Sequence, residues 1–244
     1  MAITDANISN IQHSITSENS VVPTCIGIIM DGNRRFAREH GIPQLEGHRA
    51  GFEKLKELVG WAREAGVGSI VVYAFSTENW KRGEDEVAYL LDLFKHTLIG
   101  KALESIKREG MKIRFIGERE RFSPELQKLM AQTERETEVA PGGVLGVALS
   151  YGGRAEILAA ANAAIAKGTP VDEASFRDYF WSKDIPDPDL IIRTGGEERL
   201  SGFLTWQSVY SELFFTKTFW PELSKKEFLG ILNAFAGRKR NFGK

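Results

Sequence analysis

Cysteine, long hydrophobic runs and an excess of charge of either sign are all missing from this 244-residue sequence. Its one cysteine, Cys25, cannot form an intrachain disulfide, which excludes the disulfide-stapled secreted folds. The longest apolar run covers residues 26–30, far short of the ~20 residues that a membrane-spanning helix needs. Residues 1–20 are polar and lack the basic start and apolar stretch of a secretory signal. We therefore expect a cytoplasmic protein.

The positive and negative charges nearly cancel. Lys and Arg number 32 against 33 Asp and Glu, which leaves a net charge of −1. A general nucleic-acid binder usually carries a basic excess, so we expect no nucleic-acid partner, although a local basic pocket for a small anion stays open. With 42% apolar and 27% charged residues, the composition is that of an ordinary globular protein, and the length suits one domain.

Strand and helix patterns alternate along the chain. Residues 1–22 show no periodicity and predict a flexible N-terminal tail, followed by one domain over residues 23–244. Short β-rich runs predict strands at 25–30, 69–75, 112–116, 144–149 and 189–193. Apolar residues at helical spacing predict helices at 47–65, 84–109, 124–138, 153–166 and 224–235, the last opened by a capping box of Ser224 and Glu227. The alternation indicates an α/β fold with a mainly parallel central sheet flanked by helices.

Polar residues gather where the predicted strands end. The segments 31–35, 76–82, 150–154 and 193–201 are rich in Arg, Gly, Asn and Ser, and the carboxyl ends of parallel strands share one edge of a sheet. Glycines let backbone N–H groups approach an anion, arginines match phosphate oxygens, and a carboxylate beside substrate phosphates suits Mg²⁺. Walker, dinucleotide-binding, zinc and nucleophile-elbow patterns are absent from the sequence. The residues alone predict a Mg²⁺-assisted enzyme that acts on a phosphorylated substrate.

Read as an ordered set, these loops resemble a known family. The segments 30–37, 47–49, 73–82, 151–154, 192–197, 199–207 and 210–213 resemble the cis-prenyltransferases over about residues 24–243. The resemblance implies an apolar tunnel within the α/β domain and a homodimer. It implies Mg²⁺-dependent, head-to-tail condensation of isopentenyl diphosphate onto an allylic diphosphate, farnesyl or geranyl, to give a Z-polyprenyl diphosphate, with undecaprenyl diphosphate favoured. It also implies transient contact with the membrane surface for product release.

The resemblance also assigns roles to individual residues. Asp31 resembles the Mg²⁺-associated aspartate, and Glu212 a second Mg²⁺ ligand near the subunit interface. Asn79, with Ser76 nearby, resembles the group assigned to proton removal, although an amide is a poor base and could instead orient the substrate or a water. The allylic diphosphate is expected to bind at Gly32, Asn33, Arg34, Arg35 and His48. Isopentenyl diphosphate is expected at Arg193, Arg199 and Ser201. Further substrate contacts are expected from Phe36, Thr77, Glu78, Trp80 and Arg82.

Several positions depart from the family pattern. Gly83 stands where the family often has Pro, Ser150 where it often has Asn, and Gln44 where it has a phosphate-binding Arg. In the tail, Asn241 stands where the family has an Arg that reaches the partner's active site, so either Arg238 or Arg240 compensates by a shift in position or the tail binds diphosphate more weakly. The small residues Ala74 and Gly143 favour an open tunnel and a medium or long product.

Plainer interpretations stay open for each candidate. Asp31 could form an Asx turn, Asn79 could cap a helix, and His48 could be structural. Arg193, Arg199 and Glu212 could be surface charges. The apolar face of the helix predicted at 84–109 could belong to the core instead of lining a tunnel. Three alternative functions also remain: a short-chain Z-prenyl diphosphate synthase, an irregular enzyme coupling two allylic diphosphates, and a non-catalytic partner subunit.

Overall fold

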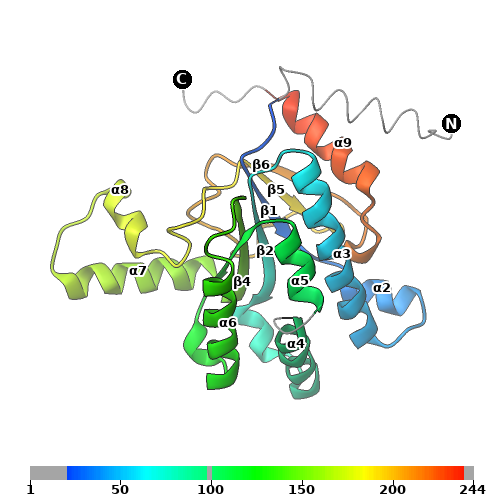
Figure 1. Ribbon diagram of the computed structural model, residues 1–244, viewed down its shortest axis with the longest axis horizontal. Helices are drawn as coiled ribbons and strands as arrows, with labels where there is room; N and C mark the ends of the chain where they lie inside the picture. Colours follow the sequence, from blue (N-terminus) through cyan, green and yellow to red (C-terminus); the bar gives the residue numbers. More distant parts are fainter. Residues whose placement is uncertain (1–20, 98–100, 239–244) are drawn as a thin grey trace.

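The central element is a six-stranded sheet in which every strand pair is parallel (Figure 1). The computed structural model describes residues 21–97 and 101–238. In the order β3-β4-β2-β1-β5-β6, the strands form one α/β domain. Their bounds are β1 (Cys25–Ile29), β2 (Ser69–Ser76), β3 (Lys112–Ile116), β4 (Val144–Tyr151), β5 (Leu190–Arg193) and β6 (Glu212–Phe215).

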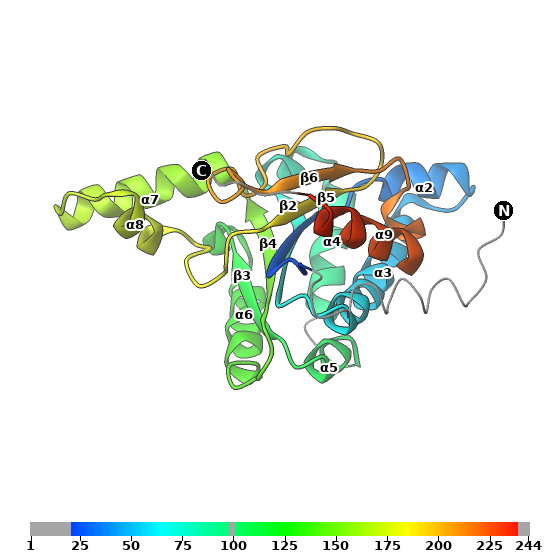
Figure 2. The same ribbon diagram turned by 90° about the horizontal axis from the view of Figure 1, so that it is seen from above.

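Helices connect the strands and cover the sheet. They are α2 (Asn33–Glu39), α3 (Gln44–Glu64), α4 (Glu84–Thr97), α5 (Lys101–Arg108), α6 (Pro124–Glu136), α7 (Gly153–Lys167), α8 (Glu173–Phe176) and α9 (Lys225–Ala236). Four 3-10 turns complete the described chain: η1 (Thr77–Lys81), η2 (Arg119–Arg121), η3 (Arg177–Tyr179) and η4 (Trp220–Glu222). Seen from above, α7 and α8 extend away from the sheet (Figure 2). Within the described residues, no helix is long and apolar enough to cross a membrane.

Alternate residues of the strands feed two hydrophobic clusters. Ile26, Ile28 and Ile192 belong to the larger cluster, together with residues of α3, α4, α5, α6 and α9. Cys25, Ile29 and Ile191 belong to the smaller cluster, with residues of the 180–204 segment. Burial on both faces explains why these strands read as continuous apolar runs and not as alternating ones.

The predicted strands and the longer helices agree with the structure, but the short helices α2 and α8 were not predicted, and α3 begins at Gln44 instead of residue 47. The helix predicted at 84–109 is two helices, α4 and α5, with residues 98–100 outside the described part. Strand β6 was missed because it has only four residues and lies at the sheet edge with half its side chains exposed.

The Ser224 cap is confirmed, since its hydroxyl accepts the Glu227 N–H at 3.1 Å. The reciprocal half of the box is wrong, because the Glu227 carboxylate accepts from Thr216 and Thr218 instead. Of the predicted tail at 1–22, residues 1–20 lie outside the described residues, and Val22 packs against the core.

Gly51 of α3 has no side chain, which allows Asn33 of α2 to pack closely against it. An alanine at Gly51 should therefore have a different effect on stability from an alanine at Gly60, which is in the same helix. A Cβ at Gly51 would lie 2.3 Å from Asn33 Oδ1, whereas a Cβ at Gly60 would meet only Glu109 Oε1 at 3.9 Å. We expect Gly51→Ala to destabilise the protein by about 2 kcal/mol through overpacking. Gly60→Ala should stabilise it by about 0.5–1 kcal/mol through helix propensity. Urea unfolding of both variants measures this, and equal effects would contradict the packing described.

Candidate active site

Asp31 lies beyond the carboxyl end of β1 and is held by Arg193 at the end of β5, by Thr194 just after it and by Arg35 of α2. Its Oδ2 accepts a hydrogen bond from Arg193 Nη2 at 2.9 Å, and its Oδ1 accepts one from Arg35 Nη2 at 3.1 Å. Thr194 Oγ1 donates to the Asp31 carbonyl at 2.7 Å. Two arginine partners are not the pattern of an Asx turn, in which the carboxylate accepts from nearby backbone. The carboxylate is held in place yet stays 30% exposed, so it is open to a ligand.

Arg193 joins Asp31 to the loop that follows β5. Its side chain is only 6% exposed, which rules out the interpretation as a surface charge. Nη1 donates to Ser201 Oγ at 2.8 Å and to the Arg199 carbonyl. Its buried Nε has no hydrogen-bond partner among the described residues. Arg199 itself is exposed and pairs with Glu197 at 2.5 Å. Three predicted residues of the isopentenyl diphosphate site therefore lie together beside Asp31.

A pocket of about 640 Å³, here called the basic pocket, opens at the start of α2. It brings together seven of the predicted residues: Asp31, Gly32, Asn33, Arg34, Arg35, His48 and Arg82. Gln44, which stands where the family pattern has an Arg, also lines this pocket, so the pocket has one positive charge fewer than the family pattern predicts. Arg38 lines it too and was missed, although it lies one helical turn after Arg34 and so shares a face of α2 with it.

Glu86, in the first turn of α4, is a second residue that the sequence did not single out. Its Oε1 accepts from Arg82 Nη1 at 2.8 Å and from His48 Nε2 at 3.1 Å, and lies 4.0 Å from Arg34 Nε. Burial by itself raises the pKa of this carboxyl, but Arg82, Arg34 and the hydrogen bond from His48 together hold the pKa below its ordinary value.

His48 is buried between the basic pocket and α4. Burial lowers the pKa of its imidazole, and the hydrogen bond to Glu86 opposes that shift without reversing it. The ring is therefore neutral near pH 7 and has one N–H to donate. His48 lines the basic pocket, as the binding role requires, and it also bonds α3 to α4, as a structural role would.

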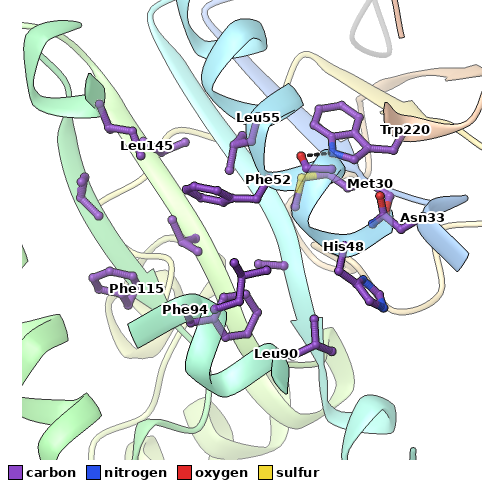
Figure 3. A pocket seen from close by; sticks show the side chains of 16 residues that line it. Met30, Asn33, His48, Phe52, Leu55, Leu90, Phe94, Phe115, Leu145 and Trp220 are labelled. Carbon is purple, nitrogen blue, oxygen red and sulfur yellow. Dashed lines mark hydrogen bonds between the residues drawn. The ribbon is translucent and has the colours of Figure 1, made fainter. Parts of the chain in front are cut away.

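An apolar cavity of about 100 Å³ adjoins the basic pocket (Figure 3). Both are lined by Met30, Asn33 and His48, which lie at one end of the cavity, with Phe115 and Leu145 at the other. The remaining lining residues are Gly51, Phe52, Leu55, Ala74, Leu90, Leu93, Phe94, Ile106, Ile113, Val147 and Trp220. Part of the apolar face of α4 thus lines a cavity, and Leu90 belongs both to that lining and to the core.

The two small residues expected along the tunnel differ in their surroundings. Ala74 lines the apolar cavity. Gly143 does not line it, and a Cβ there would lie 1.5 Å from the Gly68 carbonyl oxygen. Gly143 is therefore small because two backbone segments meet at it, and the expectation that it leaves the cavity open is not supported.

The residues after β2 shape the turn there. Ser76 N–H donates to Asn79 Oδ1 at 3.0 Å, so the amide of Asn79 caps η1, which is the plainer of its two interpretations. Trp80 Nε1 donates to Ser150 Oγ at 2.9 Å, and its ring packs against Phe75. Thr77 lies against Gly152. Neither Ser76 nor Asn79 lines the basic pocket or the apolar cavity.

Glu212, the predicted second Mg²⁺ ligand, lies far from Asp31 in the sheet. Glu212 pairs in register with Leu190, which pairs with Ile26 at the amino end of the sheet. At ~3.3 Å per residue and ~4.8 Å per strand, the Cα atoms of Glu212 and Asp31 are roughly 19 Å apart. Within one chain Glu212 cannot share a Mg²⁺ ion with Asp31, and its carboxylate pairs with Arg238.

Phe36 and Glu78, the remaining predicted substrate contacts, line neither the basic pocket nor the apolar cavity. The Phe36 ring packs against His40, with ring centroids 4.2 Å apart, and Glu78 is exposed in η1. Asn241 lies outside the described residues, so the altered tail has no structural account.

Comparisons with known proteins agree over nearly the whole chain. Residues 29–243 match a family model described as "Putative undecaprenyl diphosphate synthase". An isoprenyl transferase of Thermotoga maritima is 41% identical over 227 residues, covering 91% of this chain and 97% of the relative. A ditrans,polycis-undecaprenyl-diphosphate synthase of Xanthomonas axonopodis, specific for (2E,6E)-farnesyl diphosphate, is 43% identical over 232 residues, covering 92% of this chain and 90% of the relative.

Solved structures agree with the sequence comparisons. A crystal structure of lavandulyl diphosphate synthase from Lavandula x intermedia, in complex with dimethylallyl diphosphate, has a TM-score of 0.86 at 29% identity. It covers 91% of this chain and 99% of its own. A sheet edge that joins a basic pocket to an apolar cavity, a family model spanning most of the sequence and relatives above 40% identity together show that this chain belongs to the cis-prenyltransferases of the undecaprenyl diphosphate synthase family.

Proposed function

We propose that this enzyme adds isopentenyl diphosphate units head-to-tail to an allylic diphosphate, with Mg²⁺, and makes undecaprenyl diphosphate. The observation that carries the proposal is the junction at Met30, Asn33 and His48, where the basic pocket meets the apolar cavity. A ligand that fills both has an anionic head and a hydrocarbon tail, as a prenyl diphosphate has. Isopentenyl diphosphate would bind beside it, at Arg193, Arg199 and Ser201.

The cationic residues suit the difficult step of this reaction. When the allylic C–O bond breaks, a carbocation forms and negative charge grows on the departing diphosphate. Arg34, Arg35 and Arg82 line the pocket that would hold this diphosphate, so their positive charges would stabilise the growing negative charge. The alkene of isopentenyl diphosphate is a neutral nucleophile, so its placement by Arg193 and Ser201 matters more than any activation.

The residues present fit a Mg²⁺ ion that is held mainly by substrate. The described residues contain no group of three or more His, Cys, Asp or Glu side chains that could hold a metal. Asp31 is a partly exposed carboxylate that lines the basic pocket, and Mg²⁺ accepts one or two carboxylates completed by phosphate oxygens and water. When bound, Mg²⁺ would supply positive charge against the departing diphosphate.

Asn79, the residue that the family resemblance assigns to proton removal, does not suit the role of a base. Asn79 is engaged as a cap and is an amide, so we propose that it keeps the turn after β2 in shape. The proton from C2 of isopentenyl diphosphate would then pass to a diphosphate oxygen or to Asp31.

Cavity size predicts control of product length. Ala74 lines the apolar cavity, so Ala74→Leu should place extra volume in the path of the chain. We expect the longest product to lose several isoprene units while isopentenyl diphosphate consumption in the first addition stays near the wild-type rate. Mass spectrometry of the products measures this, with the exposed Ala163→Leu in α7 as a matched variant of unchanged product length. An unchanged length in Ala74→Leu would contradict the assignment of this cavity.

Primer choice tests the proposal against its alternatives. Labelled isopentenyl diphosphate should enter a long, extractable product with farnesyl diphosphate and Mg²⁺. The structural similarity to an enzyme crystallised with dimethylallyl diphosphate makes irregular coupling worth testing directly. A robust product from dimethylallyl diphosphate alone would favour that alternative, a product stopping at two or three additions would favour a short-chain synthase, and no product with any primer would favour a non-catalytic subunit.

The exposed apolar surface beside β6 supports a proposal for the assembly, and the lipid nature of the proposed product supports one for the location. We propose a homodimer that works in the cytoplasm and touches the membrane surface only to release its lipid. Val209, Tyr210, Leu213 and Phe215 are exposed apolar side chains on or next to the edge strand β6, and Glu212 lies among them. Sedimentation velocity would test the dimer.

A further inference from the structure

One carboxylate oxygen lies among three of the groups proposed to bind the diphosphate. Glu86 Oε1 accepts from Arg82 and from His48, and it lies within 4.0 Å of Arg34 Nε. Arg34, His48 and Arg82 line the basic pocket, while Glu86 reaches them from α4. The position of this oxygen relative to the three side chains is one that a phosphate oxygen could also take.

His48 has a single N–H, so it cannot donate a hydrogen bond to Glu86 and to a diphosphate at the same time. A carboxylate is only an acceptor, so the 3.1 Å contact places the proton on His48 Nε2. Burial lowers the pKa of His48, so the ring is neutral and Nδ1 carries no proton. In this state the single N–H of His48 is used by Glu86. A diphosphate that binds His48 has to take that N–H away.

Arg34 and Arg82 differ in how firmly they are held. Arg82 lies two residues before the start of α4 and donates to Glu86 at 2.8 Å, and its side chain is only 27% exposed. Arg34 is 57% exposed and reaches Glu86 only at 4.0 Å, so it can turn toward a ligand at small cost. The contest therefore concerns mainly His48 and Arg34.

We propose that Glu86 is an internal anion that competes with the substrate diphosphate for His48 and Arg34 and thereby limits the affinity of the basic pocket. Glu86 makes no contact with the reacting atoms in this account and acts through its neighbours. The inference rests on the proposed function, because it treats the basic pocket as the diphosphate site. It predicts that neutralising Glu86 strengthens anion binding, whereas a residue that only positions its neighbours would weaken binding when altered.

Calorimetric titration with inorganic pyrophosphate, without Mg²⁺, tests this. Glu86→Gln keeps the shape and one acceptor oxygen but removes the charge, so we expect about tenfold tighter binding than in the wild type. Glu86→Asp keeps the charge but withdraws the oxygen, and should give a smaller gain. Glu84→Gln removes the same charge from the exposed side of the same turn and should change the affinity less than twofold.

Each outcome bears on a separate claim. Weaker or unchanged binding in both Glu86 variants, with thermal unfolding showing them folded, overturns the inference and leaves the proposed function standing. Equal tightening in Glu84→Gln overturns it too, because the effect would then be general electrostatics. If Glu86→Gln does not fold, Glu86→Asp alone decides by the direction of its change. Absence of pyrophosphate binding in the wild type and every variant overturns both the inference and the proposed site.

Discussion

Replacing Asp31 with asparagine should lower kcat by about a thousandfold or more, since both the charge toward Mg²⁺ and the chemistry at the departing diphosphate are lost. Asp31 is the carboxylate on which Arg35 and Arg193 converge, and asparagine retains its size and one of its acceptor oxygens. The backbone contacts with Thr194 do not depend on the side chain, so the fold should be kept. Single-turnover kinetics with a farnesyl primer would measure the loss.

A binding measurement separates this role from a structural one. Without Mg²⁺, Asp31→Asn should bind inorganic pyrophosphate at least as tightly as the wild type, because a negative charge has left the site. A parallel loss of pyrophosphate binding would mean that Asp31 mainly holds Arg35 and Arg193 in place. Retention of wild-type kcat would contradict the assignment of Asp31 altogether.

Replacing Arg193 with lysine should reduce kcat/KM for isopentenyl diphosphate by about 10²–10³-fold, in the range found for removing one preorganised donor. A guanidinium bonds Asp31 and Ser201 at once, whereas an ammonium on a flexible stem cannot keep both contacts. The buried Nε, which has no partner among the described residues, is also lost. The KM for isopentenyl diphosphate should rise more than the KM for the allylic primer.

Arg199→Lys is the matched variant for this test. Arg199 belongs to the same loop but is exposed, and it pairs with Glu197 in a geometry that lysine can approximate. We expect it to lose about tenfold or less, since lysine keeps the positive charge toward the diphosphate and the exposed ion pair with Glu197 contributes little. Equal losses in the two variants would show that burial and the bond to Asp31 do not distinguish them.

The sequence predicts which residues reach the sheet edge better than how they act there. Asp31 and Arg193 each follow an apolar strand, and the parallel order places those strands side by side, so their meeting was expected. Arg38 and Glu86 were missed because they lie on helices, where their facing depends on how α2 and α4 pack. Asn79 looked catalytic by resemblance, while its observed contact is a local cap that its distance of three residues from Ser76 allowed.

Positions that depend on contacts between distant segments could not be predicted from the sequence. Strand β6 is short and exposed on alternate residues, so it carries little pattern, and Glu212 therefore lacked a position in the sheet. The register of β5 and β6 puts Glu212 at the opposite end from Asp31. The role of Gly143 could not be predicted either. Its lack of a side chain makes room for the Gly68 backbone, and this contact is visible only in the folded structure.

Product length from purified protein, Mg²⁺, labelled isopentenyl diphosphate and farnesyl diphosphate tests the central claim most directly. A basic pocket joined to an apolar cavity at Met30, Asn33 and His48 predicts addition to an anchored diphosphate with a hydrocarbon tail, and the proposed undecaprenyl product corresponds to about eight units added to farnesyl diphosphate. Such a product would also show that the altered tail is tolerated. No incorporation with any allylic primer would contradict the claim that this chain is an active chain-elongating transferase.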